Sequence, residues 1–286
     1  MKNTLPAGFK IIKKMGLPLI CCEAISKIPG FTQVFTTRAG GVSKKPFDSL
    51  NVGVHTGDNF KKAVINISRL EKSLAIKYAG AARQVHGSDV IILKNRALKF
   101  TGAEIRKMTD VEADALITDI PGLAVGVRLA DCAGTVIIDP VKKTVAAVHS
   151  GWRGIANKIP AKTVKMMKKH FGSKPADLTA SVSPAIGPCC YEIGADVLKL
   201  KKQKVFRGIF TKKNGRNYMN LWKGVKNLLV NEGIKPNNIH ICSMCTYDNP
   251  ELFYSHRRDK GKTGRMMALG FFKKKAGIKK AEEHHG

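Results

Sequence analysis

Three short apolar runs in the middle of the chain predict buried β-strands. Each run is rich in Val and Ile and is bounded by turn signals, which is typical of strands in the interior of a sheet. The runs span residues 123–129, 135–138 and 144–148. The same signals predict further strands at FTQVFTTR, at residues 83–86 and 89–93, at LTASV, at residues 239–247 and at MMALGFF. A sheet-forming chain is therefore expected from Phe31 onward.

Apolar residues at helical spacing predict helices between these strands. The first helix follows Asp58, which is a natural N-cap, and the last covers residues 220–230. A third carries Val164, Met167 and Phe171 after the segment HSGWRG. Pro160 fits a first helical turn but not a helix interior. This helix therefore begins either directly after HSGWRG or near Pro160. A start near Pro160 would place the positive N-terminal end of the helix dipole farther from His149.

Polar residues gather at the ends of the predicted strands, where functional sites commonly collect. Cys132 follows the first central run and His149 follows the third, so pairing of these strands would bring the two side chains together. His86 lies in a turn between two short strands, where a lone histidine is often only structural. Two histidines and a cysteine match the three-ligand pattern of a catalytic zinc site. Their wide spacing means that only the fold can bring them together.

The remaining cysteines carry no predicted site. Cys189 and Cys190 are adjacent, and neighbouring residues of a strand face opposite sides, so sharing one metal ion is not expected. Cys242 and Cys245 form a C-x-x-C within the predicted strand 239–247 and are interpreted as core residues. The sequence contains no H-x-E, which argues against a zinc deaminase of the kind built on that motif.

Composition narrows the class of protein. The chain has 286 residues, of which 43% are hydrophobic, and this is enough for a sizeable globular core. Seven cysteines, an odd number, do not suit a secreted disulfide framework, so a reducing, cytoplasmic location is expected. No apolar run approaches the roughly 18 residues of a membrane span. The net charge of +29 attracts anions and nucleic acid, but the basic residues are scattered without a nucleic-acid motif, which favours a solvated surface.

Eight sequence blocks that occur in one order resemble the YfiH or laccase-domain family of purine nucleoside phosphorylases, formerly known as multicopper polyphenol oxidases. The blocks are FTTRAGGVS, SLNVGVHTGD, QVHGSDV, ADALIT, ADC, VAAVHSGWRG, IGPCCYEIG and SHRRDKGKTGR. The resemblance implies an α/β fold, a single domain with a mixed β-sheet core flanked by helices, related to the catalytic fold of cytotoxic necrotizing factor. It divides the chain into a lead-in (1–30), a catalytic domain (31–272) and a charged, mobile tail (273–286).

The resemblance also implies the site and its chemistry. The metal-binding and catalytic positions of the family fall on His86, Cys132 and His149. A zinc enzyme is expected, with copper as the alternative metal. It would cleave adenosine, inosine, guanosine and methylthioadenosine with phosphate, and would deaminate adenosine through a water acidified by zinc. Arg38 and Arg153, each next to a turn, are the candidates for binding phosphate, chosen by their chemistry.

Two positions depart from the family pattern. Ala133 and Gly134 follow Cys132 where a bulky residue and proline are common, which is expected to give the turn more room and freedom. His256 replaces the usual tyrosine before the paired arginines and could alter the fit of the substrate.

Three other functions stay open at this point. Cys132 and His149 could form the nucleophile and base of a metal-free hydrolase. A copper-dependent polyphenol oxidase is less favoured, because one His/Cys/His set cannot supply several copper centres. The basic chain could also bind nucleic acid. The sequence does not determine the oligomeric state or the preferred nucleoside.

Overall fold

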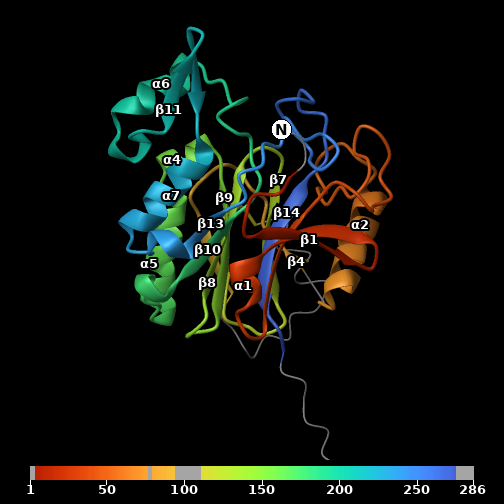
Figure 1. Ribbon diagram of the computed structural model, residues 1–286. Helices are drawn as coiled ribbons and strands as arrows, with labels where there is room; N and C mark the ends of the chain where they lie inside the picture. Colours follow the sequence, from red (N-terminus) through yellow and green to blue (C-terminus); the bar gives the residue numbers. More distant parts are fainter. Residues whose placement is uncertain (1–3, 77–78, 94–110, 275–286) are drawn as a thin grey trace, which may run out of the picture.

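Two β-sheets pack face to face, and helices cover their outer faces (Figure 1). The computed structural model describes residues 4–76, 79–93 and 111–274. No helix in these three ranges is long and apolar enough to cross a membrane. The expected α/β class is confirmed, but the core holds two large sheets where one was expected.

The first large sheet is almost entirely antiparallel, and only its edge strand β4 runs parallel to its neighbour β7. In spatial order it contains β1 (Phe9–Lys14), β2 (Leu17–Cys22), β3 (Phe31–Thr36), β14 (Met266–Phe272), β7 (Ala124–Leu129) and β4 (Ala79–Gly80).

The second large sheet is mixed, with parallel pairs at both edges and antiparallel pairs in the middle. In spatial order it contains β13 (Ile239–Ile241), β10 (Thr179–Val182), β8 (Ala133–Asp139), β9 (Thr144–Ser150), β6 (Ala115–Thr118) and β5 (Val90–Leu93).

Helices lie on opposite sides of the paired sheets (Figure 1). α2 (Phe60–Leu74) packs on the first sheet, while α5 (Ile159–Phe171) and α7 (Leu221–Asn231) pack on the second. The shorter elements are α1 (Glu23–Ser26), α4 (Trp152–Ala156), α6 (Ala195–Leu198) and the hairpin of β11 (Phe210–Lys213) with β12 (Arg216–Met219).

Side-chain alternation along the strands builds separate cores on the two faces of each sheet. In β9, Val145 and Ala147 pack between the sheets, whereas Ala146 and Val148 pack on the helical side. The sheets approach so closely at Gly134 that a Cβ there would lie 2.8 Å from the Cβ of Ala268. Each strand in the middle of the molecule is therefore buried on both faces, which explains its continuous apolar sequence.

The same close packing corrects the expectation for the residues after Cys132. Ala133 and Gly134 begin β8 and are buried, and a Cβ on Gly134 would come within 2.7 Å of Leu129. Gly134 therefore lies in a tight contact between the sheets, and it gives the turn around Cys132 no extra room.

Several boundaries also differ from the sequence predictions. The run after residue 123 forms β7 in the first sheet, whereas the next two runs form β8 and β9 in the second, so only these two pair. Asn59, not Asp58, caps α2 by accepting a hydrogen bond from the amide of Lys62. β13 ends at Ile241, because the chain beyond it turns.

The division of the chain into lead-in, catalytic domain and tail stays a prediction. Residues 9–22 of the lead-in form β1 and β2 at the edge of the first sheet, which the sequence patterns did not predict. Most of the charged tail, residues 275–286, lies outside the described residues.

Candidate metal centre

His86, Cys132 and His149 converge, although they come from three separate segments. One ligand atom from each lies within 4.8 Å of those of the other two, and the imidazole rings are 4.9 Å apart between centroids. Cys132 lies where the chain passes from β7 in one sheet to β8 in the other, and His149 lies near the end of β9. β8 and β9 are antiparallel partners, so the start of β8 lies beside the end of β9. The sulfur of Cys132, directly before β8, therefore lies near His149.

The buried carboxylate of Asp114 organises two of these three residues. Its Oδ1 lies 2.7 Å from Nδ1 of His149, which leaves Nε2 of that ring for another partner. The same carboxylate accepts hydrogen bonds from the amides of Val85, His86 and Gly87 at 3.2, 3.1 and 2.7 Å. Asp114 therefore orients one imidazole and holds the turn that carries the other, as carboxylates behind metal-binding histidines commonly do.

Two residues of the centre adopt left-handed backbone conformations that need external support. His86 has φ of 58° and is held through its amide by Asp114. Asp131, next to Cys132, has φ of 88°. Its carboxylate accepts hydrogen bonds from the Thr246 hydroxyl (2.6 Å) and the Arg257 amide (2.7 Å). The backbone at His86 and the backbone next to Cys132 are thus held by contacts with residues that are distant in the sequence.

The charged forms of Cys132 and His149 stabilise each other. Burial alone would raise the pKa of the Cys132 thiol, but His149 and His86 outweigh it and lower that pKa to about 6. Burial opposes protonation of His149, yet the Cys132 thiolate and the Asp114 carboxylate raise the pKa of this imidazole to about 9. Cys132 is therefore readily available as a thiolate, the form that serves either as a metal ligand or as a nucleophile.

The donor set fits a zinc-like ion. Two imidazole nitrogens and one thiolate are common zinc ligands at 2.0–2.3 Å, which places neighbouring ligand atoms of a tetrahedral site roughly 3.3–3.8 Å apart. The spread of the ligand atoms of His86, Cys132 and His149 is compatible with this after small side-chain adjustments. Three protein ligands leave a fourth position open, as in catalytic zinc sites.

Gly151 leaves space for the cluster because it has no side chain. A Cβ at this position would lie 2.9 Å from Sγ of Cys132 and 3.4 Å from Nδ1 of His86. We therefore expect Gly151→Ala to lower metal affinity by about 10- to 100-fold while the protein stays folded, because the ligands must shift. Competition with a chromophoric chelator measures this.

Ser150→Ala is the matched control for that variant. The Ser150 hydroxyl is buried and has no hydrogen-bond partner within the described part of the chain, so its loss should leave metal affinity unchanged. Equal affinity of Gly151→Ala and the wild-type protein would show that the ligands do not need this space.

A cavity of about 690 Å³ opens over the three residues and is strongly cationic. The guanidinium group of Arg153 lies 4.3 Å from the Trp152 ring centroid, and that of Arg257 lies 5.3 Å from the Tyr191 ring centroid. The arginines among the described lining residues are Arg83, Arg128, Arg153, Arg257 and Arg265. Such a cavity offers both fixed positive charge and aromatic surface to a ligand.

The two predicted phosphate-binding arginines have different positions. Arg153 lines the cavity from the short helix α4, and the long helix α5 begins at Ile159 with Pro160 in its first turn. Arg38 is not among the cavity residues. Its guanidinium donates hydrogen bonds to the backbone carbonyls of Asp48 and Pro250, both at 2.8 Å, and pairs with the Asp48 carboxylate. Arg38 therefore fastens loops together, and phosphate binding is not proposed for it.

Sequence patterns gave no role to Asp114, Arg83 or Arg265, whereas they placed Arg128 and Asp131 at the end of a predicted strand and named Arg257 as a candidate for anion binding. The sequence did contain a signal for Asp114, which directly precedes an apolar strand. A carboxylate that is buried in such a position needs a hydrogen-bonding or charged partner. Asp131 and Arg257 lie far apart in sequence and meet only through the fold. His256, the departure noted in the sequence, does line the cavity.

Two face-to-face sheets between helices, with a His/Cys/His cluster under a cationic cavity, define an α/β protein with a candidate metal-dependent active site. The chain belongs to the family described as multi-copper polyphenol oxidoreductase laccase, whose family model matches residues 32–273.

Relatives with names and structures agree with this assignment. The chain is 33% identical over 241 residues to purine nucleoside phosphorylase YlmD of Geobacillus stearothermophilus, covering 82% of this chain and 87% of the relative. It is 35% identical over 248 residues to purine nucleoside phosphorylase YfiH of Shigella flexneri, covering 84% and 93%. The crystal structure of YlmD from Geobacillus stearothermophilus superposes with a TM-score of 0.84 at 30% identity, covering 94% of this chain and 100% of that one.

Proposed function

We propose that the protein is a zinc-dependent purine nucleoside phosphorylase that also deaminates adenosine. The observation that carries this proposal is the convergence of His86, Cys132 and His149 in an arginine-lined cavity. Relatives at 33% and 35% identity carry the name purine nucleoside phosphorylase, which supports an enzyme of this kind. The proposed substrates are adenosine, inosine, guanosine and methylthioadenosine, together with phosphate.

The cavity suits a nucleoside together with an anion. Its volume of about 690 Å³ lies within the range of small-molecule sites. The guanidinium groups of Arg153 and Arg257 lie over one face of the Trp152 and Tyr191 rings, and these aromatic residues line the cavity with surface for a purine. We infer that the purine lies against an aromatic ring and that phosphate lies against the guanidinium groups.

The reaction requires phosphate to replace the purine at the ribose C1′ atom. A C1′–O bond forms to phosphate, the C1′–N9 bond breaks, and the purine leaves with a proton as the free base. Arg153 and Arg257 would hold and orient phosphate for this attack. Asp114 would keep the His149 ring in the orientation in which Nε2 faces its partner.

A zinc ion held by His86, Cys132 and His149 would supply Lewis acidity and an acidified water at this position. The fit of these donors to zinc supports the choice of metal. In deamination, water adds to C6 of adenosine and ammonia leaves, giving inosine. This reaction and phosphorolysis share the purine-binding surface but break different bonds, so their products separate them.

The test is an adenosine assay with purified, zinc-loaded protein, with and without phosphate. We expect free adenine and ribose 1-phosphate only when phosphate is present, and inosine in both conditions. A protein that turns over no purine nucleoside under any of these conditions contradicts the proposal. Oxidation of phenols only after copper loading would instead favour the polyphenol oxidase.

Arg153→Ala is expected to raise the KM for phosphate by about tenfold, with a smaller change in the KM for adenosine. A hydrogen bond to a charged group contributes about 1.5–3 kcal/mol, and exposure of Arg153 to solvent reduces this to roughly the lower value. Steady-state kinetics at varied phosphate measure the change. Arg38→Ala is the control, because Arg38 supports loops outside the cavity and should affect stability more than the KM for phosphate.

A metal-free thiol hydrolase is the second candidate, and the Cys132–His149 pair favours it. The lowered pKa of Cys132 and the raised pKa of His149 describe the thiolate–imidazolium pair that such enzymes use. His86→Ala separates the two functions. A Cys–His hydrolase would keep activity in this variant, whereas a zinc enzyme would lose both metal and turnover.

A further inference from the structure

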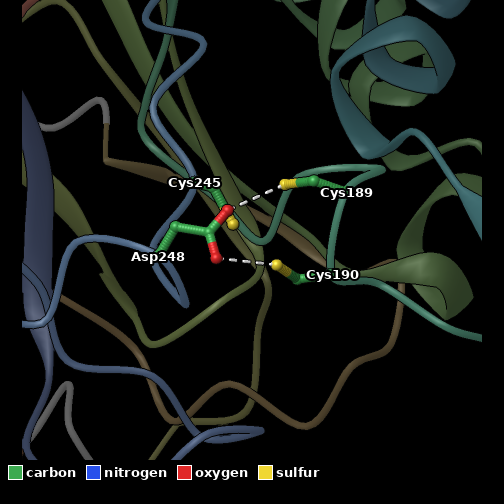
Figure 2. A group of neighbouring side chains, drawn as sticks. All are labelled: Cys189, Cys190, Cys245 and Asp248. Atoms are coloured by element: carbon green, nitrogen blue, oxygen red, sulfur yellow. Dashed lines mark hydrogen bonds between the residues drawn. The ribbon is translucent and has the colours of Figure 1, made fainter. Parts of the chain in front are cut away.

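We propose that Cys189, Cys190, Cys245 and Asp248 form a second metal site, which binds a zinc-like divalent ion with a structural role. In Figure 2 the carboxylate of Asp248 points between the sulfurs of Cys189 and Cys190, and the Cys245 sulfur lies close to the same carboxylate. These residues do not line the arginine-rich cavity. The inference is therefore independent of the proposed enzymatic function.

The ligand atoms already have the spacing of a closed site. One atom from each of the four residues lies within 4.8 Å of all the others. Asp248 Oδ2 lies 3.1 Å from Sγ of Cys189, and Oδ1 lies 3.0 Å from Sγ of Cys190. Zinc–sulfur bonds of about 2.3 Å place the sulfurs of a tetrahedral site about 3.8 Å apart. Modest adjustments of the side chains would therefore admit the ion.

The local backbone explains why two adjacent cysteines face the same point. Cys189 and Cys190 lie in a turn and not in a strand, so the strand rule that separated them does not apply. The amides of Cys190 and Tyr191 both donate to the carbonyl of Gly187, which curls the chain around the site. A Cβ on Gly187 would lie 3.0 Å from the Cys189 sulfur, so this position leaves space for the ligands.

The other side of the site is built by a second turn. Cys245 forms a β-bridge with Ala185, and its sulfur accepts a hydrogen bond from the Gly187 amide at 3.3 Å. Its carbonyl accepts a hydrogen bond from the side chain of Asn249 at 2.8 Å. The interpretation of the C-x-x-C residues as core is confirmed, because Cys242 is buried between the sheets and Cys245 is buried in the core on the helical side, where it also faces the cysteines of the other loop.

The chemistry of the donors selects the metal. Three thiolates and one carboxylate are ligands that zinc accepts in structural sites, and four protein ligands leave no open position for catalysis. Three thiolates, one carboxylate and one divalent ion carry a net charge of about −2, which requires positive surroundings. The net charge of +29 on the chain supplies these surroundings, while Arg258, which is ion-paired with Asp259, holds the turn by donating to the carbonyls of Thr246 (2.8 Å) and Tyr247 (3.2 Å).

An ion here would connect the two loops that support the catalytic cavity. The first loop runs from Ile186 to Tyr191, and both of these residues line the cavity. The second includes Thr246, whose hydroxyl donates to Asp131 beside Cys132. Binding would therefore hold the cavity wall against the backbone of the first centre.

The test counts metal ions in protein purified under reducing conditions and loaded with zinc. We expect two zinc ions per wild-type chain and one in Cys132→Ala, which lacks a ligand of the first centre. Cys190→Ala should also bind one, and the double variant none. Cys242→Ala is the matched control, because Cys242 lies three residues before Cys245 but packs between the sheets, and it should bind two.

A second measurement covers the case in which a cysteine variant fails to fold. Asp248 is exposed, so Asp248→Asn should fold, and in the Cys132→Ala background it should weaken zinc affinity at least about tenfold. Cobalt bound to Cys132→Ala should show an intense sulfur-to-metal charge-transfer band from three thiolates. One zinc ion per wild-type chain with none left in Cys132→Ala would overturn the proposal. A disulfide between Cys189 and Cys245 in zinc-loaded, reduced protein would also overturn it.

Discussion

Cys132→Ala and His149→Ala are each expected to lose the metal ion of the first centre and to lower nucleoside turnover by about 10³-fold or more. A catalytic metal ion contributes several kcal/mol of transition-state stabilisation, and about 4 kcal/mol corresponds to a factor of 10³ in rate. Removing either residue leaves only two of the three converging ligands. Metal analysis and kcat/KM for adenosine, with phosphate saturating, measure both effects.

The controls separate loss of the ligand from loss of the fold. Ser150→Ala changes a buried residue next to His149, and Cys242→Ala removes a thiol from the core between the sheets. Both should retain turnover. If His149→Ala kept the metal ion of the first centre and full turnover, His149 would be neither a required ligand nor required for turnover. If instead His86→Ala lost zinc but kept turnover, a metal-free mechanism through Cys132 and His149 would gain support.

Asp114→Asn is expected to lower metal affinity by about 10- to 100-fold, which is typical for loss of a carboxylate behind a metal-binding histidine. The carboxylate accepts hydrogen bonds from the amides of Val85, His86 and Gly87 and lies 2.7 Å from Nδ1 of His149. An asparagine has one acceptor oxygen, and its NH₂ group would face a donor. We also expect the free energy of unfolding to fall by about 1–3 kcal/mol, since a buried donor loses its partner.

Asp139→Asn is the matched control for Asp114→Asn. Asp139 is also buried, and its carboxylate accepts hydrogen bonds from the amides of Val141 and Lys142 in the turn after β8, away from the metal ligands. Both amides donate to Oδ1, which asparagine retains, so this variant should keep its metal affinity and lose less stability than Asp114→Asn. Chelator competition and chemical denaturation measure the two quantities. Equal metal affinities of the two variants would contradict the role of Asp114 in orienting His149.

Much of the fold could be predicted from the sequence because the central strands are buried on both faces. The apolar runs of β7, β8 and β9 and the helical spacing of α2, α5 and α7 all correspond to observed elements. The partners of these strands could not be predicted in the same way. β7 and β8 are consecutive, yet they belong to different sheets, and β14 pairs with β7 from the far end of the chain.

The same limit applies to the candidate site. His86, Cys132 and His149 could be named from the blocks QVHG, ADC and VHSGWRG, but their spacing gave no distance between them. Arg38 was chosen for its charge and position after a strand, whereas its hydrogen bonds to Asp48 direct it into a loop. A positively charged residue in the sequence suggests binding of an anion, but only the fold determines whether its side chain reaches the cavity.

The adjacent cysteines show how one local conformation changes the conclusion. If Cys189 and Cys190 continued a strand, their sulfurs would point to opposite faces. The turn stabilised by hydrogen bonds to the Gly187 carbonyl brings both sulfurs to Asp248. This local turn is the feature that the sequence pattern missed.

A zinc-edge anomalous difference map from crystals of the zinc-loaded protein tests most directly whether three distant segments hold one metal ion in the cavity. The expected result is a peak about 2.0–2.3 Å from one ligand atom each of His86, Cys132 and His149. A map without a peak among these three side chains, from protein that turns over adenosine, would contradict the metal centre on which the proposed function depends.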